Sequence, residues 1–247
     1  MYVLIVIFAL LMGGCAKNKT KETMNAEELA HKAQAYIKAK KHDDAVPFIA
    51  ELLARYPDHQ KIGKYKILLA ELQFKAGNYS QAKELYENFS EFFPADKYAE
   101  YARYKTILAS FYQTLPADCD QSYTEETVKL CKDYLTNNTS SKYRSDVEKM
   151  LAQNQERLAD KEIYIFNFYL GKKQFDAART RLAFLKEKFA HIPNLEPRLA
   201  YLAYKLALKE KKKDEALLQM DILQNKYPGS PFISMAQNLS TKHTFIF

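Results

Sequence analysis

The feature that most constrains the fold of this chain is a pattern of small, aromatic and proline residues that recurs about every 37 positions. Ala45 and Ala82 are 37 residues apart, and so are Pro57 and Pro94. A period of roughly 20–50 residues is typical of proteins built by stacking one short structural unit. Each such unit covers its apolar face only by packing against its neighbours. The period therefore predicts a stacked repeat architecture.

The spacing within one period predicts two helices joined by a short turn, and it resembles the tetratricopeptide repeat. Gly77 turns the chain out of the first helix, and Ala82 lets the second helix cross it closely. Pro94 ends the second helix because proline cannot continue one. The sequence thus predicts an all-α solenoid of five helical hairpins, which we place at residues 26–57, 62–94, 98–138, 160–190 and 197–228.

The segment 141–170 departs from the regular period. It contains neither Gly nor Pro, and its apolar residues keep a helical spacing throughout. We expect one long helix here, joining N-terminal repeats in residues 25–140 to C-terminal repeats in residues 141–235, with a tail at 236–247. A coiled coil is a weaker interpretation because the heptad spacing is not sustained. The third repeat is degenerate and has a longer loop around residues 115–122.

Composition supports helices and shows an uneven charge. Gly is scarce, at 6 of 247 residues, which disfavours turn-rich β architecture. Residues 161–247 carry 15 Lys and Arg against 8 Asp and Glu, whereas residues 1–160 carry 22 of each. This asymmetry indicates either an ordinary solvated surface or a surface for an acidic partner, anionic lipid headgroups or nucleic acid.

The N-terminus has the pattern of an export signal. Residues 3–12 are almost wholly apolar, too few to span a bilayer but enough for the core of a signal peptide. Small residues then precede Cys15, as in the lipobox of bacterial lipoproteins. We expect a signal peptide at 1–14 and a lipidated Cys15 with a tether at 15–24. Two features depart from that pattern: Met12 stands where Leu is usual, and no Lys or Arg precedes Lys17. The alternative is an ordinary cleaved signal or a buried N-terminal helix.

The sequence contains none of the common motifs of hydrolases, nucleotide-binding proteins or metalloproteases. The five His residues are scattered, and none adjoins a Cys, so we predict no catalytic residue, no metal site and no cofactor. Cys119 and Cys131 form either one disulfide or two free thiols. A wall-cleaving enzyme would need a further domain with a Gly-rich pocket, for which the chain has no room.

A tyrosine-rich helix at 98–112 offers a candidate peptide-binding surface. Tyr98, Tyr101 and Tyr104 are spaced so that they share one side of a helix. Tyrosine rings supply apolar area and their hydroxyls can bond a peptide backbone, but aromatic residues also serve as core packing. Both interpretations stay open, and the three residues could divide between the two roles.

The basic C-terminal third contains candidate residues for contact with a protein partner. Arg181 lies three residues after Ala178, which is expected at a helix crossing. At that position the stem of an arginine packs along its helix while the guanidinium faces outward. Arg181 is the foremost candidate, and Arg179 is its neighbour.

The order of short motifs along the chain resembles the outer-membrane assembly lipoproteins of the BamD (ComL) type, over nearly all of the mature sequence. The motifs are KYAEY at 97–101, DCDQ at 118–121, SKY at 141–143, LADKE at 158–162, and FDAA at 175–178 followed by Arg181. The chain departs from the family pattern at Cys119, at Tyr104 and at residues 137–138, where Arg, Gly and Tyr-Pro are usual.

This resemblance implies a non-enzymatic lipoprotein on the periplasmic face of the outer membrane, within the machinery that folds β-barrel proteins. Its N-terminal repeats would receive signal segments of unfolded barrel proteins at Tyr98, Tyr101 and Tyr104. Its C-terminal half would dock on the barrel insertase through Arg181 and Arg179, beside other assembly lipoproteins and without nucleic acid. The alternative function is a periplasmic repeat scaffold lipoprotein in cell-wall synthesis or envelope constriction.

Overall fold

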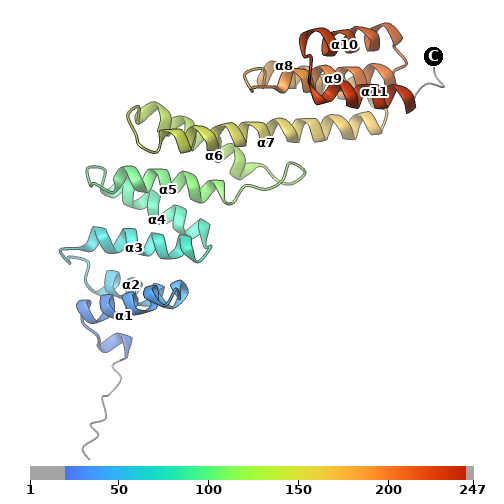
Figure 1. The fold of residues 1–247 in the computed structure, drawn as a ribbon. Coiled ribbons are helices and arrows are strands. Elements are labelled where there is room, and N and C mark those ends of the chain that lie inside the picture. The colour runs from blue at the N-terminus through green and yellow to red at the C-terminus, as the bar shows by residue number, and fades with distance from the viewer. Residues whose placement is uncertain (1–19, 243–247) are drawn as a thin grey trace, which may run out of the picture. The chain divides into compact units, whose positions relative to one another are not determined.

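The computed structural model describes residues 20–242, with side chains over residues 20–240. The expected signal peptide, the lipidation site Cys15 and the last five residues of the expected tail lie outside this range. The described residues form a 3-10 turn at Lys21–Thr23 and eleven α-helices, without a β-strand (Figure 1). The prediction of an all-α solenoid of helical hairpins is confirmed.

The helices pair in chain order, and each pair corresponds to one predicted repeat. The pairs are α1 (Ala26–Lys38) with α2 (His42–Arg55), α3 (Ile62–Lys75) with α4 (Tyr79–Phe92), α5 (Ala99–Phe111) with α6 (Ser122–Asn137), α7 (Arg144–Gly171) with α8 (Phe175–Lys188), and α9 (Leu195–Lys209) with α10 (Lys213–Lys226). A last helix, α11 (Pro231–Lys242), covers the apolar face of the fifth pair and extends into the segment expected to be a tail.

The chain divides into two compact units, one ending at Ala102 and the other beginning at Arg103. In the first unit, the small side chains expected at helix crossings are fully buried. Ala45 and Ala82 have no exposed surface, and Ala82 packs in one cluster with Ala70 and Tyr86. An asparagine cap begins α1, where the Asn25 side chain accepts a bond from the Glu28 amide. Crossing and cap thus follow directly from residue type.

In the second unit, the 28-residue α7 serves two helix pairs. Its first half packs through Val147 and Met150 against Cys131 and Tyr134 of α6. Its second half belongs to another cluster, in which Ala159, Ile163, Phe166 and Leu170 of α7 pack with Leu182 of α8 and Leu202 of α9. The long helix predicted over 141–170 is therefore present, and α6 and α8 cover different halves of it.

The short turns inside four helix pairs share one backbone conformation. Lys40, Gly77, Lys173 and Lys211 all have positive φ, at 59°, 85°, 59° and 62°. In each turn the next amide bonds back to a carbonyl five residues earlier, as Asn78 does to Gln73. This is the usual way to end a helix with a left-handed residue. The sequence revealed it only at Gly77, because lysine gives no hint of such a conformation.

Candidate partner-binding sites

Two of the three candidate tyrosines pack against the core of the first unit. Tyr98 and Tyr101 are half-buried beside the cluster around Tyr86. The hydroxyls of Tyr101 and Tyr86 each donate a hydrogen bond of 2.5 Å to Oε1 of Glu71. Burial, and then the bond to Glu71, raise the pKa of Tyr86 far above its usual value, so the hydroxyl keeps its proton. Glu71 thereby ties α3 to α4 and to the start of α5.

The third tyrosine belongs to a different cluster, in the second unit. Tyr104 stacks on Tyr143, with ring centroids 4.4 Å apart and planes at 6°. It packs against Ile107 and Val147, and burial is the main cause that raises its pKa. All three candidate tyrosines therefore take part in packing, and a peptide groove lined by them stays a prediction.

Arg181 reaches from α8 to the second half of α7. Its guanidinium lies 3.1 Å from the carboxylate of Glu162, and the Arg181 side chain is 37% exposed while that of Glu162 is 16% exposed. The arginine thus pairs within the unit and still presents a face to solvent. A partner carboxylate could approach that face without breaking the pair.

Arg179, on α8, is held in a similar way by Glu210, which follows the last residue of α9. One nitrogen of its guanidinium lies 2.5 Å and 2.6 Å from the two carboxylate oxygens of Glu210. Glu210 is 9% exposed and Arg179 45% exposed. Lys212 approaches the same carboxylate at 3.5 Å. The buried anion fixes the position of Arg179, which stands at the edge of a groove.

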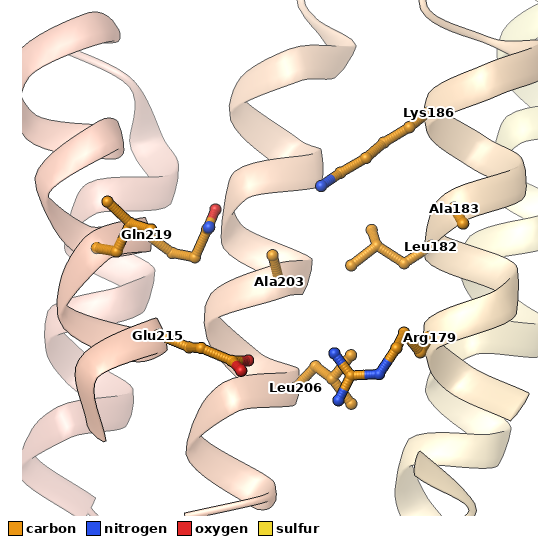
Figure 2. Close-up of a pocket in the computed structure, with 9 residues that line it drawn as sticks. Arg179, Leu182, Ala183, Lys186, Ala203, Leu206, Glu215 and Gln219 are labelled. Carbon is orange, nitrogen blue, oxygen red and sulfur yellow. The ribbon is translucent and has the colours of Figure 1, made fainter. Parts of the chain in front are cut away.

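We name this depression, of about 330 Å³, the C-terminal groove; it runs between α8 and α10 and crosses α9. Leu182, Ala203 and Leu206 form its apolar floor (Figure 2). Basic side chains of α8 line one wall, and polar and acidic side chains of α10 line the other. The wall residues are Arg179, Ala183 and Lys186 on α8, and Glu215, Leu218 and Gln219 on α10. Figure 2 shows the Arg179 guanidinium and the Glu215 carboxylate pointing from opposite walls toward Leu206.

This arrangement is suited to holding a segment of another protein. An apolar floor takes up an apolar side chain, and charges of opposite sign on the two walls orient what lies between them. Among the residues the structure describes, no group of three or more His, Cys, Asp or Glu is placed to hold a metal ion. In the same part of the chain, no helix combines the length and apolar character needed to cross a membrane.

Sequence reasoning identified only Arg179 among the residues of this groove. The α10 wall was missed, although α10 carries a usable signal. Ala216 and Leu223 are buried toward α9, whereas Leu217 and Leu218 are 59% and 56% exposed. Two adjacent leucines outside the buried stripe of a helix indicate an apolar surface left open on the outside.

The two cysteines of the described part are free thiols. Cys119 is exposed in the loop between α5 and α6, and Cys131 is buried in α6. Burial raises the pKa of the Cys131 thiol to about 12. Of the two states left open by the sequence, the structure therefore has the unpaired one, with Cys131 as an apolar packing residue.

Comparison with known proteins extends over both units. Residues 22–213 match the protein family described as YfiO, outer membrane lipoprotein. The chain is 25% identical, over 240 residues, to the outer membrane protein assembly factor BamD of Rickettsia prowazekii, covering 95% of this chain and 94% of that protein. It is also 25% identical to the BamD of Caulobacter vibrioides over 91% of this chain and 75% of that protein. A thermophilic TPR protein of Thermus thermophilus aligns over 90% of this chain and 98% of its own, with 15% identity and a TM-score of 0.36.

Proposed function

This chain belongs to the YfiO family of outer membrane lipoproteins, and we propose that it is a subunit of the β-barrel assembly machinery. In this role its N-terminal repeats bind unfolded outer-membrane proteins and its C-terminal half docks on the barrel insertase. Cys15 carries the lipid that holds it at the periplasmic face. The observation that carries the proposal is the similarity to two BamD assembly factors over more than nine-tenths of this chain.

The C-terminal groove supports the docking part of the proposal. A partner segment that places an apolar side chain over Leu206 brings its flanking carboxylates toward Arg179 and Lys186. Both cations stand on the α8 wall, so the groove favours a segment that turns its acidic side toward α8 over one that turns it toward α10. Arg181 does not line this groove; it pairs with Glu162 of α7 on another side of α8, so its outward face would offer the partner a separate contact.

The first unit supports the binding of unfolded chains. Phe92, at the end of α4, is 73% exposed, the largest exposed fraction among the large apolar side chains of the described residues. Tyr98 lies a few residues further on and is half-buried. An exposed aromatic residue of this size is typical of surfaces that bind apolar segments.

The groove offers a test with a closely matched control. Leu218 lines the groove and the adjacent Leu217 does not, yet the two side chains are almost equally exposed. The protein is captured from gently solubilised membranes through a C-terminal tag, and the co-purifying proteins are identified by mass spectrometry. We expect a large outer-membrane barrel protein with the unaltered chain and with Leu217→Glu, and its loss with Leu218→Glu.

Two results would contradict the proposal. Equal recovery of the barrel protein with both variants would show that docking uses another surface. Recovery of cell-wall enzymes in place of the barrel protein would favour the alternative function, a scaffold lipoprotein of cell-wall synthesis.

A further inference from the structure

The second half of α7 carries an outward stripe of two aromatic rings between two lysines. Lys161, Tyr164, Phe168 and Lys172 follow one another at spacings of three, four and four residues, which places them on one side of the helix. Tyr164 and Phe168 are 52% and 53% exposed. We call these four residues the α7 stripe.

The α7 stripe is exposed because α7 is longer than its partner on that side. α6 has 16 residues and α7 has 28, and the cluster shared with α6 includes only residues from the first half of α7. The second half buries its opposite side, through Ile163, Phe166 and Leu170, against α8 and α9. The rings of the stripe therefore lie on a part of α7 that makes its contacts elsewhere.

The charge around the rings is positive. The Lys161 ammonium lies 5.7 Å from the centre of the Tyr164 ring, and that of Lys172 lies 5.9 Å from the centre of the Phe168 ring. Within residues 161–172 the only acidic residue is Glu162, and it pairs with Arg181 on α8. Asp120, in the loop before α6, has the pKa of its carboxyl group lowered by hydrogen bonds and then by the charge of the nearby Lys161. Among the contacts described, this is the only carboxylate near the stripe, and it lies at the Lys161 end.

The neighbouring helix adds further positive charge. α9 runs alongside α7 in the same direction, because Asp160 pairs with Arg198 and Asn167 accepts a bond from Lys205 at 2.8 Å. Burial, and then the nearby Lys209, lower the pKa of Lys205. Lys205 and Lys209 therefore lie toward the same end of α7 as Lys172, whereas Arg198 is paired with Asp160 near the Lys161 end.

We propose that the α7 stripe is a membrane-contact surface, which places Tyr164 and Phe168 among the headgroups of an anionic phospholipid bilayer. Aromatic rings settle at the interface between headgroups and acyl chains, and lysines flanking them reach the phosphates. The side of a single straight helix meets a plane without needing a matching pocket. A member of an outer membrane lipoprotein family is expected to lie next to a bilayer.

The chain has no tryptophan, so a single introduced tryptophan reports on this contact. The full chain carrying Phe168→Trp, purified from membranes, is reconstituted into vesicles whose acyl chains are brominated and quench tryptophan fluorescence at close range. One set of vesicles is phosphatidylcholine alone, and the other contains phosphatidylglycerol. The matched reporter is Leu217→Trp, at a similarly exposed position on α10.

We expect Phe168→Trp to be quenched in the anionic vesicles and little in the neutral ones, and Leu217→Trp to be quenched in neither. Adding Lys161→Glu and Lys172→Glu to Phe168→Trp should abolish the difference in quenching between anionic and neutral vesicles, since each lysine near an anionic surface strengthens membrane binding about fivefold. The control pair Lys188→Glu and Lys226→Glu has the same net charge and should preserve it. Tyr164→Trp provides a second reporter on the stripe should Phe168→Trp fold poorly.

Equal quenching at positions 168 and 217 in anionic vesicles would overturn the proposal, as would quenching at 168 that ignores lipid charge. A fluorescence change at 168 that needs a purified partner protein, and not lipid, would assign the stripe to a protein contact. All three results are independent of the insertase docking test at Leu218.

Discussion

At the scale of single residues, the carboxylate of Glu71 accepts a hydrogen bond from a tyrosine that was predicted to bind peptide at the surface. Tyr101 is among the residues predicted to bind peptide, and its hydroxyl donates to Glu71 together with that of the fully buried Tyr86. A hydroxyl committed to an internal carboxylate has less freedom to bond an external backbone. Tyr98, which makes no side-chain hydrogen bond among the described residues, is the better placed of the two for an external ligand.

Removing the Tyr101 hydroxyl should therefore weaken the fold. We expect Tyr101→Phe to lower the free energy of unfolding by about 1–2 kcal/mol, since a half-buried carboxylate loses one of its donors. The matched change Tyr98→Phe should cost little. Urea unfolding followed by circular dichroism measures both, and equal stability of the two variants would show that the bond to Glu71 contributes nothing.

The pair of Arg181 and Glu162 allows internal and external roles of the arginine to be separated. Arg181→Glu alone places two carboxylates together and also removes a positive charge from the surface. The exchange of Arg181→Glu with Glu162→Arg restores the pair within the unit. We expect recovery of the insertase to be lost in the single variant and to stay lost in the exchange, because docking needs the cation at position 181. Full recovery in the exchanged protein would mean that Arg181 acts only through the fold.

At the scale of elements, the four left-handed turns are formed by residues of unequal suitability. A non-glycine residue in the left-handed region costs about 1–2 kcal/mol. Replacing it by glycine removes this cost, but the greater freedom of glycine in the unfolded chain offsets part of the gain. Lys40→Gly, Lys173→Gly and Lys211→Gly should each raise the free energy of unfolding by about 0.5–1 kcal/mol. The reverse change, Gly77→Lys, should lower it through backbone strain; beyond the adjoining residues no atom lies within 4 Å of a Cβ built there, so no steric clash adds to the cost. Melting temperatures measure all four, and a lower melting temperature in the glycine variants would contradict this.

How much of each element was predictable depends on whether its cause is local. Alanine at a crossing and proline after a helix act within one repeat, so four of the five helix pairs were predicted close to their observed bounds. The fourth was predicted at 160–190, whereas its first helix, α7, begins at Arg144. The left-handed lysines and α11 were not, because lysine carries no turn signal and α11 is held by apolar contacts with α9 and α10. The C-terminal groove joins Leu182, Leu206 and Leu218 from three helices, and nothing in the local spacing brings them together. Tyr104 has the same spacing as its neighbours but packs on another cluster.

At the scale of the whole molecule, repeats that contact only their neighbours should confine damage to one unit. Ala82→Leu inserts a large side chain at a fully buried crossing and should cost about 1–3 kcal/mol. We expect hydrogen exchange to accelerate in α3 and α4 while α8 to α10 keep their protection. Ala178→Leu should give the opposite pattern. Uniform acceleration along the chain would show that the two units unfold as one.

The left-handed lysines have a further consequence for the long-range field of the second unit. Lys173 and Lys211 end helices that run side by side in the same direction, so their ammonium groups stand along one edge, beside the negative ends of two helix dipoles. The Debye length is about 8 Å at physiological ionic strength. The edge thus behaves as a short row of partly screened charges. Dilute salt extends its attraction for anions, and concentrated salt reduces it to contact range.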